Sequence, residues 1–128
     1  MEELIKVQRS KHDAHDLLLG ILYYFPEEAK WDELGFHETL SQIALKYRIL
    51  DNFAFNDLHG LPYCPDFGKV FDLLELSGLL KRNEDYIKLF IDIIRGHFDE
   101  EIKPTFEDKD LDMLKELSLD LQKALGIA

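Results

Sequence analysis

The sequence predicts a mainly helical fold with one small β-hairpin, built as a single domain over residues 1–128. Apolar residues recur three and four positions apart along most of the chain, which is typical of helices with one buried face. Only one stretch places short, half-apolar runs on both sides of turn-forming residues. A content of 46% hydrophobic and 32% charged residues is typical of a globular chain, and 128 residues suffice for one domain.

The first two helices are predicted near residues 11–25 and 36–48. Pro26 ends the first helix, because its ring cannot sit in a continuing helix. The second helix has the clearest amphipathic pattern of the chain, carried by Phe36, Leu40, Ile43, Ala44 and Tyr47. After it, the segment 53–55 (Phe-Ala-Phe) places two aromatic residues on one side at a period of two, which predicts a short strand.

A third helix and a hairpin are predicted next. Pro65 suits the first helical position, where its missing N–H costs nothing, and Gly78 suits a C-terminal stop, so the helix covers about 65–77. The half-apolar runs 79–82 and 86–89 flank three turn-forming residues and indicate the hairpin.

Two further helices are predicted in the last third of the chain. The first of them ends before Pro104, and the second covers about 108–125, where leucines line one side. The complete order is helix, helix, short strand, helix, hairpin, helices. This is the order of a winged helix-turn-helix core, expected over about 11–90, with a C-terminal helical extension over about 91–128.

The charge balance excludes several classes of partner. The net charge is −11 and the isoelectric point is near 4.8, so the chain repels nucleic-acid phosphates and anionic membranes. The longest apolar run, 17–25, is far shorter than the ~20 residues that cross a bilayer. Cys64 is the only cysteine and cannot form an internal disulfide, and the acidic N-terminus lacks the cationic start of a signal peptide. We therefore expect a cytoplasmic protein.

The stretch 36–80 resembles a known family. Its pattern is an amphipathic helix, an aromatic strand, a Gly-Pro turn, a helix, and a Gly-Leu-Leu end before the hairpin. The residues that carry it are Leu40, Ile43, Tyr47, Phe53, Phe55, Gly60 to Cys64, and Gly78 to Leu80. This pattern is similar to the Panacea domain, the SocA-like antitoxin-associated family of bacterial winged-helix proteins. The chain departs from it by an extra Leu61, by Cys64 in place of the usual serine, and by lacking the expected lysine in the first helix.

The resemblance implies a module that binds and restrains a partner protein, commonly a toxin, without a catalytic residue or a cofactor. The composition of the third helix favours the same conclusion, because a DNA-recognition helix presents Arg, Lys, Asn or Gln to base edges. Residues 65–77 instead carry Lys69 alone among three acidic residues. The candidate partner contacts are two aromatic residues expected to be exposed, the neighbouring cysteine and two bases of the hairpin: Tyr63, Phe67, Cys64, Lys81 and Arg82.

Two alternative functions stay open, and so does a homodimer. A DNA-binding regulator would use one basic patch formed by the hairpin together with Lys46 and Arg48; the hairpin bases are Lys81, Arg82 and Lys88. A small metal-dependent hydrolase would use His12, His15 and Asp16, whose spacing places them on one helical face. Cys64 precedes a predicted helix, where backbone N–H groups lower a thiol pKa, but packing or capping is the simpler role.

Overall fold

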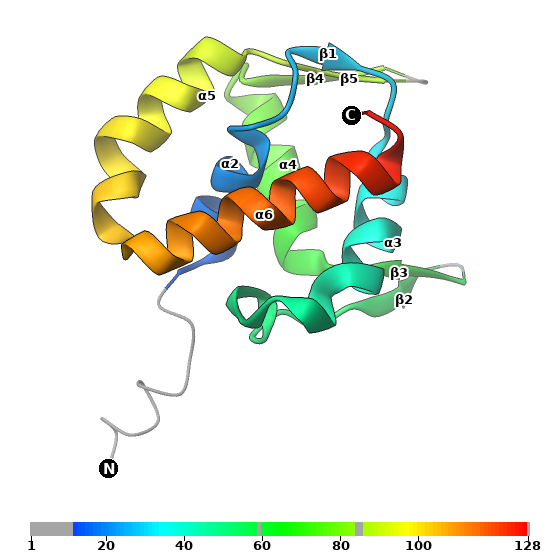
Figure 1. Cartoon of the computed structure of the whole chain (residues 1–128). Coiled ribbons are helices and arrows are strands. Elements are labelled where there is room, and N and C mark those ends of the chain that lie inside the picture. Colours follow the sequence, from blue (N-terminus) through cyan, green and yellow to red (C-terminus); the bar gives the residue numbers. More distant parts are fainter. Residues whose placement is uncertain (1–11, 59, 84–85, 128) are drawn as a thin grey trace.

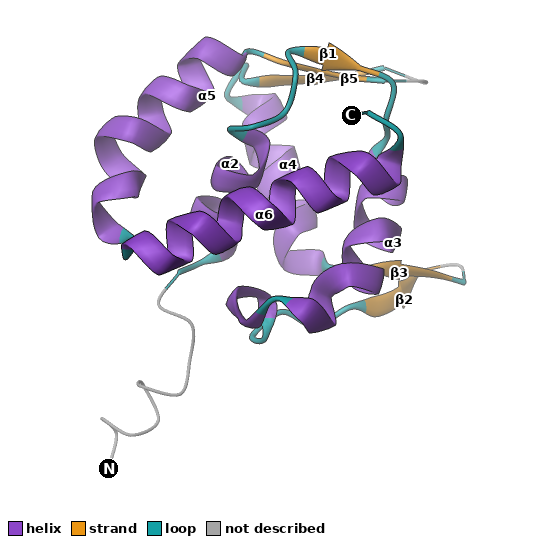
Figure 2. Ribbon diagram, viewed as in Figure 1, coloured by secondary structure: helices purple, strands orange, loops and turns teal. Residues whose placement is uncertain are grey.

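The computed structural model describes residues 12–58, 60–83 and 86–127. Over these residues the protein is mainly helical with two small antiparallel hairpins, which confirms the predicted fold class (Figures 1 and 2). The predicted first helix begins at residue 11, which lies outside the described residues. Among the described residues, no helix combines the length and the apolar character that crossing a bilayer requires.

The first two helices of the described part of the chain, α2 and α3, each begin directly after an aspartate that caps them. Helix α2 spans Ala14–Leu22, and the carboxylate of Asp13 accepts a hydrogen bond from the backbone N–H of Asp16 at 2.9 Å. Strand β1 spans Glu28–Ala29, and helix α3 spans Glu33–Ile43. Asp32 caps α3 by accepting from the N–H of Gly35 at 2.7 Å, which explains why α3 begins before the predicted residue 36. The helix then tightens into a 3-10 turn, Ala44–Lys46, and a second 3-10 turn, Arg48–Leu50, follows the extended residue Tyr47.

The first hairpin lies directly after the predicted aromatic strand. Strand β2 spans Asn56–Leu58 and pairs antiparallel with β3, Leu61–Tyr63. The prediction of a strand over residues 53–55 is wrong. The N–H of Phe53 donates to the carbonyl of Leu50 in a turn, and its ring stacks on Phe67 with centroids 5.0 Å apart. The aromatic side chains are therefore held by packing, and strand pairing starts only at Asn56.

The third helix and the second hairpin have the predicted places. Helix α4 spans Pro65–Leu76, and Gly78 follows with a φ of 78°. Strand β4, Leu80–Arg82, pairs with β5, Ile87–Leu89, and β1 adds to the other side of β5, so the sheet order is β1-β5-β4. The observed order is helix, strand, helix, hairpin, helix and hairpin, so the first strand precedes α3, whereas the predicted order placed a strand only after the second helix. The β2–β3 hairpin is inserted between the second and third helices.

The C-terminal helices share the core of the domain. Helix α5 spans Ile91–His97 and continues as a π-helical turn, Phe98–Ile102, and a 3-10 turn, Lys103–Thr105. Helix α6, Asp108–Leu125, crosses in front of α2 in Figure 1 and packs on both α2 and α3. Its apolar side is fully buried, through Leu114, Leu117 and Leu121. The predicted extension is therefore one wall of the hydrophobic core.

Candidate functional site

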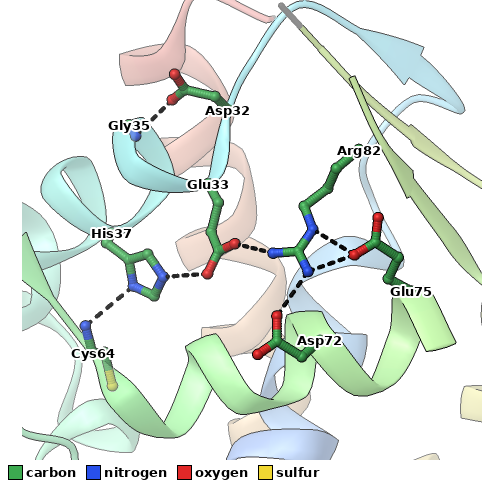
Figure 3. A network of polar contacts seen from close by, with 8 residues as sticks. All are labelled: Asp32, Glu33, Gly35, His37, Cys64, Asp72, Glu75 and Arg82. Carbon is green, nitrogen blue, oxygen red and sulfur yellow. Dashed lines mark hydrogen bonds and ion pairs between the residues drawn. The ribbon is translucent and has the colours of Figure 1, made fainter. Parts of the chain in front are cut away.

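Arg82, at the end of β4, holds three carboxylates from two helices (Figure 3). Its Nη1 donates to the carboxylate of Glu33 in α3. Its Nη2 donates to Asp72 at 2.7 Å and to Glu75 at 2.6 Å, and its Nε also donates to Glu75 at 3.1 Å. The hairpin is thereby tied to α3 and to α4 at once. We call these four residues the Arg82 cluster.

The Arg82 cluster has a formal charge of −2, since three carboxylates surround one guanidinium. Burial lowers the pKa of Arg82, but the hydrogen bonds that Arg82 donates to Glu75 and Asp72, with the charges of Glu33 and Glu75, outweigh this effect and raise the pKa above its ordinary value. The side chain is 26% exposed and its donors point at protein oxygens. Arg82 was predicted as a partner contact and as part of a basic patch. Its charge is already compensated within the domain.

His37 extends this cluster into the core. Its imidazole is fully buried, and its Nε2 lies 3.1 Å from the Oε2 of Glu33, one turn before it in α3. On the other side of the ring, Nδ1 accepts a hydrogen bond from the backbone N–H of Cys64 at 3.2 Å. A continuous polar path therefore runs from the hairpin, through α3, to the residue that precedes α4.

Cys64 is fully buried, and its thiol points away from His37 in Figure 3. Burial raises the pKa of Cys64, although backbone N–H groups of Phe67 and Asp66 lower it in part. The structure therefore brings no Cys–His nucleophile together here, and its side chain makes no capping hydrogen bond. As a fully buried side chain, Cys64 has a packing role rather than the predicted partner contact.

The two aromatic candidates differ in exposure. Tyr63 is half-buried, with its ring 4.2 Å from that of His37 and its hydroxyl lying against Gly68. Burial raises the pKa of Tyr63, and the charges of Glu33 and Asp72 add to this effect. Phe67 is fully buried, so the expectation that it is exposed is wrong. The physical reason is the angular position of Phe67 around α4, which places it on the inward face with Val70, Phe71 and Leu74.

The predicted single basic patch does not form. Lys81 is exposed on β4, and Lys88 on β5 lies 5.7 Å from the ring centre of Phe90. The segment 44–50, which carries Lys46 and Arg48, lies at the opposite end of the molecule from β4 and β5 (Figure 1). Lys46 there forms an ion pair with Asp120 at 3.8 Å. The bases are thus divided between two ends of the domain.

The predicted metal ligands also separate. The His12 ring stacks on Phe106, with centroids 3.6 Å apart, and its Nε2 lies 3.3 Å from Asp110. The residues whose ligand atoms do lie within 4.8 Å of one another are Asp13, His15 and Asp16. Asp13 already caps α2, and the N-terminal end of a helix repels cations. The set His12, His15 and Asp16 is therefore not a preassembled metal centre.

The outward face of α4 carries two leucines that sequence reasoning passed over. Leu73 is 54% exposed and Leu76 is 84% exposed, while Lys69 and Asp66 continue the same face toward the start of the helix. Spacings of three, four and three residues place these four side chains in one row. The signal was present in the sequence, since these positions fall opposite the inward face of α4.

A surface hollow of about 440 Å³ adjoins the first half of this face. It lies between α4, the start of α2 and the loop before β2, and its lining residues are His12, Asp13, Ala14, His15, Asn52, Phe53, Asp66, Lys69 and Val70. The hollow and the two exposed leucines together give α4 a contact surface along its whole length.

Comparison with protein-family models, curated proteins and solved structures finds no match to this chain.

Proposed function

We propose that this protein is a non-catalytic interaction module of winged-helix type, which binds and restrains a partner protein in the cytoplasm. The observation that carries the proposal is the chemistry of α4, which occupies the place of a recognition helix. Its outward face presents leucines and carboxylates, and Lys69 is its only base. Base edges are read by Arg, Lys, Asn and Gln, and phosphates are bound by cations.

The Arg82 cluster supports the same conclusion. The hairpin of a DNA-binding winged helix needs cations free to reach phosphates, because released counterions supply most of the affinity. Arg82 instead donates to Glu33, Asp72 and Glu75. A phosphate approaching this point would meet the excess negative charge of the cluster. The resemblance of residues 36–80 to an antitoxin-associated family adds the expectation that the partner is a protein.

Affinity capture of the tagged protein from its native host tests the proposal. The expected result is a protein partner in stoichiometric amount that survives nuclease treatment. Titration with labelled genomic duplexes at about 50 mM salt is the second arm, and we expect no binding there. Duplex binding that weakens steeply as salt is raised to about 200 mM would overturn the proposal in favour of a DNA-binding regulator.

A further inference from the structure

We propose that the outward face of α4 is a docking surface for a cationic amphipathic helix of a partner protein. This inference rests on the proposed function and names the surface and the chemistry of the partner. The docking surface consists of the row Asp66, Lys69, Leu73 and Leu76 together with the adjoining hollow. Its two parts supply an apolar contact and a place where an anchoring side chain can enter.

The apolar part of the docking surface consists of two exposed leucines. Leu73 and Leu76 are three residues apart and both point to solvent, with exposed fractions of 54% and 84%. Neither contributes to the core, which α4 reaches through its opposite face. A helix laid against another helix makes contact at such i, i+3 and i, i+4 positions, so this row matches the spacing of anchors on an amphipathic helix.

The hollow continues this row toward the start of α4. Val70 and Phe53 contribute apolar lining, whereas Asp13, Asp66 and Lys69 contribute the polar part. An apolar anchor next to a cation suits such a lining, since the anchor removes apolar surface from water and the cation approaches the carboxylates.

The charge of the surroundings selects a cationic partner. The docking surface and the Arg82 cluster together contain five carboxylates and two cations, a formal charge of −3. The cluster adjoins the row, because Asp72 and Glu75 are the chain neighbours of Leu73 and Leu76. The carboxylates are Asp13, Glu33, Asp66, Asp72 and Glu75, and the cations are Lys69 and Arg82. Opposite charge speeds association and orients the partner, whereas like charge on both sides opposes binding.

A second copy of this chain fits the docking surface less well. In a symmetric dimer the same patch of each protomer faces its counterpart. Two acidic surfaces would then meet, each on a chain of net charge −11. A partner helix with leucines on one face and lysines or arginines on its flanks matches both the apolar and the acidic part.

The test uses the full chain and a synthetic helical peptide of leucine and lysine, about 18 residues or five turns long, with leucines at helical spacing. A peptide of the same composition in scrambled order removes the amphipathic face but keeps the charge. Fluorescence anisotropy measures binding, and amide chemical shifts locate it. We expect the patterned peptide to bind at least about tenfold more tightly than the scrambled one, with shifts concentrated in α4 and the lining of the hollow.

The matched variants are L73D combined with L76D, and L45D as the control. Leu45 is 97% exposed in the 3-10 turn Ala44–Lys46, so L45D adds a carboxylate at a leucine outside the docking surface. We expect the double variant to lose at least about tenfold in affinity and L45D to bind as the wild type does. Both variants should melt within about 3 °C of the wild type, because exposed positions contribute little to stability.

Three outcomes would overturn the docking surface. These are equal binding of patterned and scrambled peptides, equal losses in the double variant and L45D, and shifts confined to residues outside α4 and the hollow. The same variants separate this failure from that of the proposed function. A host protein captured equally by the wild type and by L73D/L76D overturns the docking surface and leaves the module intact. Mapped peptide binding without any captured host protein counts against the module alone.

Discussion

The imidazole of His37 accepts a hydrogen bond at Nδ1 from the backbone N–H of Cys64, at a distance of 3.2 Å. Because an N–H donates here, Nδ1 carries a lone pair and Nε2 carries the ring proton. Nε2 therefore donates to Glu33 at 3.1 Å. One buried side chain thus fixes α3 relative to the residue that precedes α4 and positions the carboxylate that Arg82 binds.

Replacing His37 by leucine should destabilise the protein by roughly 1–3 kcal/mol, because the buried N–H of Cys64 loses its acceptor. Urea unfolding measures the loss. His97→Leu is the control, since His97 is exposed and its replacement should stay within about 0.5 kcal/mol. Long-range nitrogen correlation spectra of the wild type should show His37 as the Nε2–H tautomer. The Nδ1–H tautomer would contradict this arrangement.

Removing the guanidinium of Arg82 should cost about 1 kcal/mol of stability in Arg82→Met. Glu33, Asp72 and Glu75 would then repel one another, but Asp72 is two-thirds exposed, so solvent screens part of the effect. Lys81→Met, at the neighbouring exposed position, should change stability by less than about 0.5 kcal/mol. Adding Glu33→Gln to Arg82→Met should recover part of the loss in chemical denaturation. An additive or larger loss in the double variant would contradict the proposed repulsion.

Two helical glycines should respond oppositely to alanine. A Cβ at Gly20 would overlap the side chain of Leu114, where α2 and α6 cross, and would lie 3.0 Å from the ring of Phe98. Gly20→Ala should therefore destabilise by about 1–3 kcal/mol through overpacking. Gly96 in α5 is exposed and has nothing within 4 Å of that position. Gly96→Ala should stabilise by about 0.5–1 kcal/mol. Thermal melting of the two variants distinguishes the cases, and shifts of equal sign would contradict the packing.

Alkaline pH should unfold the protein partly through Tyr47. Burial raises the pKa of Tyr47 above its ordinary value of 10.0, and the hydrogen bond to Asp120 with the charges of Asp120 and Glu116 adds to it. Above about pH 10 the phenol of Tyr47 loses its proton in the unfolded state but keeps it in the folded state. The contribution of Tyr47 to the free energy of unfolding is therefore fully present below about pH 10 and is lost as the pH rises further. The slope of unfolding free energy against pH should be smaller in Tyr47→Phe. A slope in Tyr47→Phe equal to that of the wild type, together with an ultraviolet titration that places the pKa of Tyr47 near its ordinary value of 10.0, would contradict the burial effect.

The sequence by itself determined most of the local structure. Pro65 and Gly78 predicted both ends of α4 to within one residue. The missing N–H of proline and the left-handed backbone conformation of glycine act on their own chain neighbours, so their effects can be inferred from the sequence. The second hairpin followed from turn residues between half-apolar runs. The strand predicted for segment 53–55 is absent, because aromatic residues spaced two apart do not show whether the backbone pairs with a neighbouring strand.

Only the tertiary structure decided which side chains are available for function. Arg82 and Lys81 are neighbours in the chain, but only Arg82 meets the carboxylates of α3 and α4. His12 was a candidate ligand until the fold placed Asp110, 98 residues away, beside it. Periodicity tells which face of a helix is apolar, whereas ion pairs and burial depend on which faces of separate elements meet. The packing of α4 against the other elements left Leu73 and Leu76 on the surface and buried Phe67 on the opposite face of the same helix.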